Sequence, residues 1–215
     1  MNDVIDDRQV LSSPLSTMLI DQALNRIKGG SMGISFSEPE KLKEIFDGPN
    51  RSQWQGTEYI LSSLAIRKDD IIADVGAGTG YFSRLFAERV TQGKVYSIDA
   101  EPNMVSYMKQ RFSTSFENVQ VIQSEPDNPH IPADTKLVFI ANTYRFIEDR
   151  MRFLSNLKSQ TSPTTRFVVI DIKGNRGQVP SDKAISEWEN AGFMVEIFDE
   201  DGCPEHFILI MSHQQ

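Results

Sequence analysis

Three glycines within five residues, Gly76, Gly78 and Gly80, make up the segment of this sequence best suited to ligand binding. Glycine lets the backbone approach a ligand closely and adopt conformations that other residues avoid. The run Ile71–Val75 precedes them, is apolar except for Asp74, and is typical of a buried parallel strand. Apolar residues at helical spacing follow the glycines. The sequence therefore predicts a strand, a glycine turn and a helix, as in the first unit of a nucleotide-binding sheet.

The spacing of these glycines argues against one class of ligand. A dinucleotide fingerprint needs glycines at its first, third and sixth positions, the last so that the helix can pack closely on the strand. Here Tyr81 occupies the sixth position, which argues against a nicotinamide dehydrogenase. A glycine triplet alone also fits an ordinary tight turn, so its meaning depends on the residues downstream.

An acidic residue, Asp99, follows the second predicted strand, Val95–Ile98. It lies about twenty residues past the glycine turn, where a carboxylate can accept two hydrogen bonds from a ribose diol. Pro102 suits the first turn of the helix that follows. Asp99 is alternatively a cap for that helix. It can serve a ribose only if backbone donors do not already occupy its oxygens.

These segments resemble a known family. DVGAGTG and VYSIDAEPNM are similar to motif I and the acidic residue after it in the class I S-adenosylmethionine-dependent methyltransferases. EIFDGPNRSQWQ, EPDNPHIP, NTYRFIEDR and the final AGF segment extend the resemblance over residues 44–211, to bacterial small-molecule methyltransferases akin to the quinone-biosynthesis C-methyltransferases. The resemblance implies S-adenosyl-L-methionine as cofactor and a small-molecule methyl acceptor.

The resemblance also implies cofactor contacts. Glu125, after a third predicted strand at 119–122, would accept a hydrogen bond from the adenine amino group. Asp127 is an open alternative, because Pro126 redirects the chain between the two acids. Gln55 lies in a stretch that runs beside the cofactor in the resembling subgroup. The full set of expected cofactor contacts is Asp74, Gly76, Ala77, Gly78, Gly80, Asp99, Ala100, Glu125, Asn142 and Gln55.

The fourth predicted strand, Leu137–Ala141, is wholly apolar and therefore central, and the segment after it would face the acceptor. Asn142, Tyr144 and Arg145 are the expected catalytic residues, with Tyr144 orienting the acceptor and Arg145 binding a carboxylate or phosphate on it. The subgroup carries an aspartate and paired histidines in this segment, and an acid in place of Lys136. These departures leave a second function open, that of a regulatory or scaffold protein that binds S-adenosylmethionine without transferring its methyl group.

The length of 215 residues suits one α/β domain with an extra segment. The resemblance implies a Rossmann-like, doubly wound, seven-stranded and mostly parallel sheet. A fifth strand is expected at 166–172, and an antiparallel hairpin of 193–198 and 206–211 closes the sheet. Before this hairpin, Ser181 is expected to cap a helix that ends at Gly192.

Residues 1–50 are expected to form a helical arm, and residues 51–215 the S-adenosylmethionine-binding domain. Helices at 15–28 and 39–46, joined by a glycine-rich hinge at 29–33, suit a lid that closes over the cavity. Packing against the outside of the sheet, or formation of a homodimer, is an equally open role for this arm.

A further helix is expected over 51–63, leading into the first strand. Trp54, Tyr59 and Ile60 fall on the face of this helix that we expect to be buried. Trp54 is therefore expected to belong to the core.

Charge and composition exclude several classes of function. The net charge is −8 with no stripe of Lys and Arg, which argues against a nucleic-acid substrate. His130, His206, His213 and Cys203 lack metal-ligand spacing, so no metal site is expected. No stretch approaches the roughly 18 apolar residues that would indicate a membrane span. The acidic N-terminus and the single cysteine lead us to expect a cytoplasmic protein.

Overall fold

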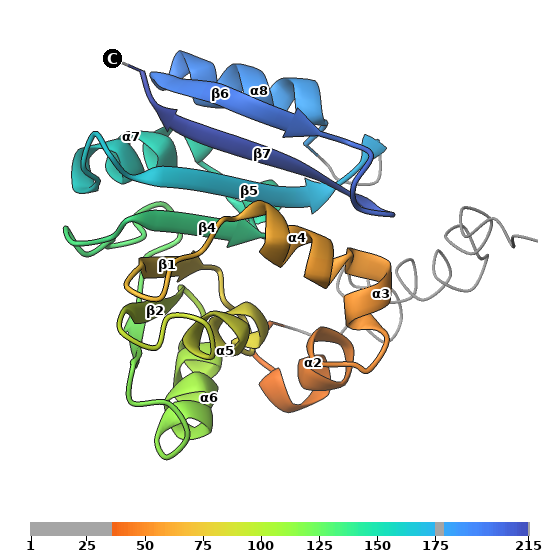
Figure 1. The fold of residues 1–215 in the computed structure, drawn as a ribbon, viewed down its shortest axis with the longest axis vertical. Coiled ribbons are helices and arrows are strands. Elements are labelled where there is room, and N and C mark those ends of the chain that lie inside the picture. Colours follow the sequence, from red (N-terminus) through yellow and green to blue (C-terminus); the bar gives the residue numbers. More distant parts are fainter. Residues whose placement is uncertain (1–35, 175–178, 215) are drawn as a thin grey trace, which may run out of the picture.

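The structure is a computed structural model that describes residues 36–174 and 179–214. The predicted helix at 15–28 and the predicted hinge at 29–33 lie outside these residues. Within them the chain forms a seven-stranded sheet flanked by helices (Figure 1).

The strands run in the order β3-β2-β1-β4-β5-β7-β6 across the sheet. Their bounds are β1 (Ile71–Val75), β2 (Lys94–Asp99), β3 (Val119–Gln123), β4 (Leu137–Ala141), β5 (Arg166–Ile172), β6 (Phe193–Asp199) and β7 (His206–His213). The first five strands pair in parallel, and β7 is antiparallel to both β5 and β6. The predicted Rossmann-like sheet with its C-terminal antiparallel hairpin is confirmed.

The described helices are α2 (Pro39–Phe46), α3 (Arg51–Gln55), α4 (Thr57–Ser63), α5 (Tyr81–Ala87), α6 (Pro102–Phe112), α7 (Arg150–Gln160) and α8 (Ser181–Asn190), with a short 3₁₀ turn, η2 (Tyr144–Phe146). Two apolar layers hold them to the sheet. One packs α4 and α5 against one face through residues such as Leu61 and Phe86. The other packs α7 and α8 against the opposite face through residues such as Leu154 and Trp188 (Figure 1).

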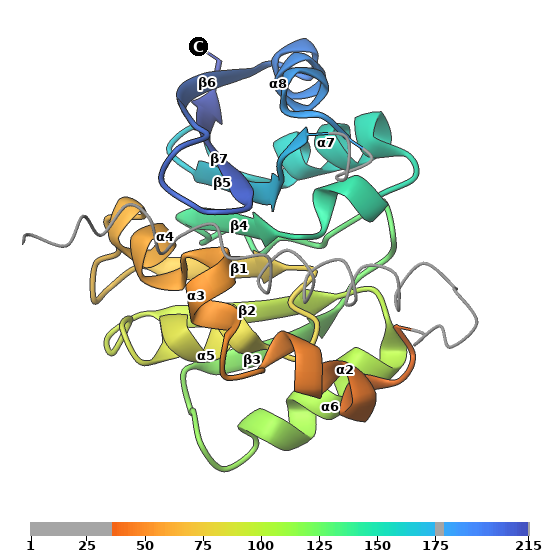
Figure 2. The same ribbon diagram turned by 90° about the vertical axis from the view of Figure 1, so that its right-hand side faces the viewer.

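The middle of the sheet is buried on both faces. Leu137, Val138, Phe139 and Ile140 of β4 are all 0% exposed, which is why this strand reads as an unbroken apolar run. The order of the strands reverses between β1 and β4. In open α/β sheets the ligand crevice lies at such a switch point, outside the carboxyl ends of the strands. Here α2 and α3 lie at that edge of the sheet (Figures 1 and 2).

The prediction of one helix over 51–63 is wrong. Gly56, with φ of +70°, divides this stretch into α3 and α4. Tyr59 was expected on a buried face but is 45% exposed, and its hydroxyl donates to Asp199 at 2.7 Å. The turn at Gly56 changes the direction of the helix axis, so residues of α3 and α4 do not continue one stripe. Ile60 is fully buried, as expected.

The predicted cap of α8 is also wrong. Pro180 is the N-cap residue, and Ser181 is the first residue of the helix. The Ser181 hydroxyl donates to Glu200 at 3.1 Å rather than accepting from the helix N–H groups. At the other end Gly192 follows the C-cap residue with φ of +84°, as expected of a glycine that ends a helix.

Candidate functional site

A cavity of about 630 Å³ lies over the switch point. Its walls come from the ends of β1, β2, β4 and β5, from the segment after β3, and from α2 and α3. This volume falls in the usual range of small-molecule sites, about 300–1,000 Å³. The strand order places Asp99 and Glu125 on one side of the glycine turn and Asn142–Ile147 on the other. The cavity therefore has two halves that meet at the glycine turn.

Gly76 and Gly78 serve the turn in different ways. Gly76 has φ of +71°, and a Cβ added to it would lie 2.2 Å from Oγ1 of Thr143, so no side chain fits between β1 and the segment after β4. Gly78 has φ of +59°, and a Cβ there would lie 3.4 Å from the Phe46 ring. Phe46 belongs to α2, so the C-terminal part of this helix covers Gly78. Gly76, Ala77 and Gly78 all line the cavity.

The N–H groups of the turn are already bonded within the protein. Those of Gly76 and Ala77 donate to the carbonyl oxygen of Ile98, at 2.8 and 3.0 Å. That of Gly78 donates to Oδ2 of Asp99 at 2.7 Å. A pyrophosphate is normally bound by free N–H groups at such a turn. The site therefore suits a ligand without phosphate at this position, in agreement with the glycine spacing.

Asp99 lies at the end of β2 and lines the cavity, as expected. Its Oδ1 accepts from the Glu101 N–H at 2.9 Å and its Oδ2 from the Gly78 N–H. Burial raises the pKa of Asp99, while these two hydrogen bonds oppose the rise. Each carboxylate oxygen retains a second lone pair for a ribose hydroxyl. The cap of α6 is Glu101, whose carboxylate accepts from Asn103, so Asp99 is not needed for that role.

Glu125, and not Asp127, faces the cavity. Its side chain is 63% exposed, and Oε2 lies 3.3 Å from Nε2 of His130. Asp127 pairs with Arg152 at 3.0 Å outside the cavity. Glu125 is therefore the better placed of the two acids to accept a hydrogen bond from an adenine. Ala100 lines the same half of the cavity.

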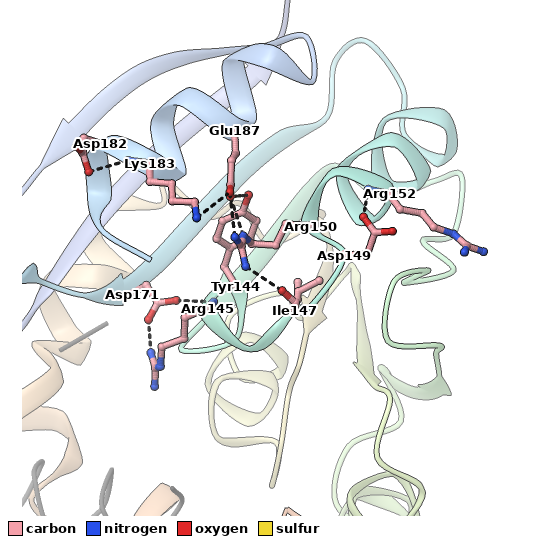
Figure 3. Close-up of polar contacts among 10 residues, drawn as sticks. All are labelled: Tyr144, Arg145, Ile147, Asp149, Arg150, Arg152, Asp171, Asp182, Lys183 and Glu187. Atoms are coloured by element: carbon pink, nitrogen blue, oxygen red, sulfur yellow. Dashed lines mark hydrogen bonds and ion pairs between the residues drawn. The ribbon is translucent and has the colours of Figure 1, made fainter. Parts of the chain in front are cut away.

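Asn142 and Arg145 line the other half of the cavity, as expected. Asn142 has φ of +56°, a left-handed conformation that asparagine tolerates better than most residues. Its Oδ1 lies 2.9 Å from Nε2 of His206 and 3.2 Å from Nη1 of Arg145. Arg145 forms a buried ion pair with Asp171 at the end of β5 (Figure 3). Asp171 neutralises the Arg145 charge, so the expected binding of a carboxylate or phosphate is not what this arrangement favours.

The structure does not bring Tyr144 to the cavity. Its ring is 1% exposed within the core, and its hydroxyl donates to Oε2 of Glu187 at 2.8 Å. Figure 3 shows the ring directed toward Glu187 and Arg150, whereas the Arg145 side chain is directed toward Asp171. Burial and the hydrogen bond to Glu187 raise the pKa of Tyr144. In this arrangement Tyr144 links η2 to α8 and does not orient an acceptor.

Three other expected contacts also lie outside the lining of the cavity. Asp74 is 2% exposed and accepts from the Ser83 hydroxyl at 2.6 Å, behind the glycine turn. Gly80 is the N-cap of α5, and a Cβ there would lie 2.7 Å from the Phe112 ring. Gln55 is fully buried, and its Oε1 accepts from Nε of an arginine on α3, Arg51, at 2.6 Å. These three residues do not line the cavity but contact the elements that form its walls.

Arg51 is a cavity residue that the sequence analysis missed. Its guanidinium lies 4.0 Å from the centroid of the Tyr81 ring, and besides Gln55 it donates to the Phe46 carbonyl. No carboxylate of the described residues lies within ion-pair distance of it. Burial lowers the pKa of Arg51 to about 10. A buried cation held only by neutral groups suits a ligand carboxylate. The sequence signal was the Arg51–Gln55 spacing of four residues on one helix.

Trp54 also lines the cavity. Its ring stacks on His206 with centroids 5.7 Å apart, and it packs against Ile172 at the end of β5. This agrees only in part with its expected place in the core. Across the described ranges no group of His, Cys, Asp and Glu side chains has an arrangement that could hold a metal ion. No described helix has the length and hydropathy needed to span a membrane.

Comparisons with known proteins agree with this geometry. The methyltransferase domain family matches residues 66–214. A solved S-adenosylmethionine-dependent methyltransferase from Aquifex aeolicus is 26% identical, with a TM-score of 0.70 over 80% of this chain and 97% of that one. A malonyl-[acyl-carrier protein] O-methyltransferase of Ilyobacter polytropus is 31% identical over 43% of this chain and 34% of its own length.

A probable cobalt-precorrin-6B C(15)-methyltransferase of Methanobrevibacter smithii is 32% identical over 53% of this chain and 59% of its own length. The matches span between 27% and 59% of the length of the curated relatives. Their printed names give different acceptors, and the likeness to the quinone-biosynthesis subgroup stays a prediction. The chain belongs to the methyltransferase domain family and has the class I fold, whose methyl donor is S-adenosyl-L-methionine.

Proposed function

We propose that this protein transfers the methyl group of S-adenosylmethionine to a small-molecule acceptor bound in the same cavity. The observation that carries the proposal is the continuity of the cavity across the switch point, from Asp99 and Glu125 to Asn142 and Arg145. A cofactor held in the first half would direct its reactive end toward the second. The cover formed by α2 and α3 suits a small acceptor better than a folded protein.

The lining residues fit the parts of the cofactor. Asp99 and Glu125 offer carboxylate oxygens to a ribose and to an adenine amino group. The glycine turn offers close approach, with the N–H groups of Gly76, Ala77 and Gly78 already bonded within the protein. Arg51 offers a cation to the carboxylate of the amino-acid end. In this assignment Gln55 acts indirectly, since its Oε1 holds Arg51.

The donor in such a reaction is already activated, so the protein has to align the acceptor with it and exclude water. Phe36, Phe46 and Trp54 narrow the cavity from the side of the N-terminal segment. The ring of Phe36 meets that of Phe146 edge-on, with centroids 5.3 Å apart. This contact joins the segment before α2 to the segment after β4. We propose that the expected arm at residues 1–50 acts as a cover through its described part.

The test is turnover with an unfractionated acceptor pool. The protein is incubated with S-adenosylmethionine and a metabolite extract, and S-adenosylhomocysteine is measured against a control without extract. Mass spectrometry is expected to find a product heavier by one methyl group. Asp99→Asn should lower the affinity for the cofactor about tenfold or more, because a charge-assisted hydrogen bond contributes about 1.5–3 kcal/mol. Asp127→Asn, at an acid outside the cavity, serves as the matched control.

Tight binding of the cofactor without turnover across a broad extract would contradict the enzyme proposal. It would favour the regulatory or scaffold protein instead.

A further inference from the structure

The chemistry of the acceptor half of the cavity narrows the class of acceptor, given the proposed function. We use "acceptor half" for the lining residues Phe36, Trp54, Ala141, Asn142, Thr143, Arg145, Phe146, Ile147 and Ile172. Phe36 contacts Phe146, and Trp54 packs against Ile172, so both rings belong to this half. The walls are thus largely aromatic and aliphatic. They suit an acceptor whose body is apolar.

Among the side chains that commonly accept a proton in catalysis, only carboxylates line this cavity. The three histidines, the one cysteine and the five tyrosines of the chain all lie within the described residues, and none is among the residues that line it. The lining carboxylates are Glu44, Asp99, Glu101 and Glu125. Asp99 ends β2, Glu101 follows it, and Glu125 follows β3. Glu44 lies on α2, which the ion pair between Asp47 and Arg111 joins to α6 on the same side.

The polar side chains of the acceptor half are Asn142, Thr143 and Arg145. The Thr143 hydroxyl donates to the carbonyl oxygens of Gly76 and Ala141. The Nη1 group of Arg145 donates hydrogen bonds to Asn142 and Asp171, while its Nε and Nη2 groups make no hydrogen bond to the described residues. A guanidinium has five N–H donors, so Arg145 still has donors for the acceptor. This half of the cavity can stabilise an anion but has no group suited to remove a proton.

The degree of ionisation then separates the common nucleophiles. With the side-chain pKa values of about 8.5 for cysteine, 10 for tyrosine and 10.4 for lysine as guides to a thiol, a phenol and an alkylammonium, roughly one cysteine-like thiol in ten is ready to react at pH 7.5. The reactive form is roughly three in a thousand for the phenol and one in a thousand for the amine. An alcohol is far less ionised still. Thiolate is also a strong nucleophile in itself.

The ion pair between Arg145 and Asp171 favours an acceptor that enters the cavity uncharged over one that carries a permanent negative charge. Because Asp171 neutralises Arg145, a permanently charged phosphate or carboxylate would lose its hydration without meeting a full opposing charge. A thiol enters as a neutral, weakly hydrated group and needs stabilisation only when it ionises. We infer that the acceptor is an apolar thiol, methylated as its thiolate beside Arg145.

The reaction balances without a further reactant. The thiol releases its proton to solvent, and the thiolate sulfur forms a bond to the methyl carbon. The bond from that carbon to the sulfonium sulfur breaks, and its electron pair stays on sulfur. The products are a methyl thioether and S-adenosylhomocysteine.

The experiment compares acceptors of one shape. Benzyl mercaptan, benzyl alcohol, benzylamine and 4-methylphenol are each incubated with the protein and S-adenosylmethionine, and the methylated product is measured by mass spectrometry. The proposal predicts a kcat/KM for the mercaptan at least tenfold above that of each other compound. 2-Mercaptoethanol, a polar thiol, should also react at least tenfold less well. Equal or better turnover of the alcohol, amine or phenol would overturn the thiol assignment.

Arg145 supplies a second readout. Arg145→Gln should raise the pH at which benzyl mercaptan reaches half its maximal kcat/KM, and it should affect a more acidic aryl thiol less. Arg152→Gln, at an exposed arginine outside the cavity, is the matched control. If Arg145→Gln does not fold, Arg145→Gln/Asp171→Asn removes both charges of the buried pair. An unchanged pH profile in the folded variant contradicts the role of Arg145.

The same measurements distinguish failure of the thiol inference from failure of the proposed function. If S-adenosylmethionine binds and a metabolite extract is methylated while all thiols are inert, the thiol inference fails and the proposed function stands. If the cofactor does not bind, the proposed function fails and the inference fails with it.

Discussion

Arg51 belongs to no sequence motif that indicates a binding site, yet its side chain lines the cavity. It lies five residues after Phe46, and both reach the cavity because α2 and α3 meet above the glycine turn. Its only described partners are the Gln55 amide oxygen, the Phe46 carbonyl and aromatic faces. A carboxylate is the ligand group that would complete this environment.

We therefore predict that Arg51→Met weakens S-adenosylmethionine about tenfold or more, from the loss of a charge-assisted hydrogen bond of about 1.5–3 kcal/mol. The same variant should bind 5′-methylthioadenosine within about twofold of the unmodified protein, because that ligand has the adenosine and sulfur but no carboxylate. Calorimetric titration of both ligands provides the comparison. Equal losses for the two ligands would show that Arg51 acts on the fold and not on the carboxylate.

Asp74 is buried beneath the glycine turn, where its carboxylate accepts a hydrogen bond from Ser83. Its ionisation affects the free energy of unfolding of the protein. Burial raises the pKa of Asp74 to about 7, while hydrogen bonds from Ser83 and the charge of Arg51 oppose the rise. An unfolded aspartate titrates near pH 3.9, so between about pH 4 and 7 the folded chain binds the extra proton. The contribution of Asp74 to stability is therefore greatest at low pH and is lost as the pH rises through this window.

The corresponding prediction concerns Asp74→Asn. The free energy of unfolding of the unmodified protein should fall relative to that of Asp74→Asn between pH 4 and 7, by on the order of a few kcal/mol. Denaturant unfolding at several pH values measures the difference. A difference that stays constant across this window would mean that Asp74 keeps an ordinary pKa in the folded chain.

At the scale of elements, α2 and the glycine turn form one unit. The Arg111 guanidinium bonds both Asp47, at the end of α2, and the Thr79 carbonyl in the turn, at 2.8 and 2.7 Å. This arrangement holds the Phe46 ring over Gly78. A side chain at Gly78 would have to adopt φ of +59° and lie against that ring.

Gly78→Val should therefore lose more than tenfold in affinity for S-adenosylmethionine and about 1–2 kcal/mol in stability from the left-handed backbone. Gly174→Val is a matched control, because Gly174 also has positive φ but nothing within 4 Å of an added Cβ. It should lose stability without losing affinity. Calorimetry and thermal unfolding give the two quantities. Undiminished affinity in Gly78→Val would contradict the place of the turn in the site.

Over the whole molecule, the sequence predicted best where local pattern and buried position coincide. The bounds of β4 and β5 agree with the predicted runs, because all residues of these strands except Ala141 and Arg166 are buried. The glycine turn was also predicted correctly from the sequence, because its positive φ values and the close packing of Gly76 against Thr143 require glycine. These features follow from residues that are close together in the chain.

The sequence-based predictions were less accurate where a side chain's position depends on residues far away in the chain. Tyr144 was expected at the acceptor, but its hydroxyl bonds Glu187, 43 residues later in the chain. The charge of Arg145 is neutralised by Asp171, which belongs to the next strand of the sheet. The break at Gly56 faces Cys203, whose Sγ would lie 3.2 Å from an added Cβ. No local pattern in the sequence indicates these partners.

We propose that the cavity over the glycine turn binds S-adenosylmethionine and not a dinucleotide. The experiment is calorimetric titration of the unmodified protein with S-adenosylmethionine and, separately, with nicotinamide adenine dinucleotide. We expect one S-adenosylmethionine per chain and no heat of binding for the dinucleotide, since the N–H groups of Gly76, Ala77 and Gly78 are bonded to Ile98 and Asp99. Binding of the dinucleotide without binding of S-adenosylmethionine would contradict this proposal.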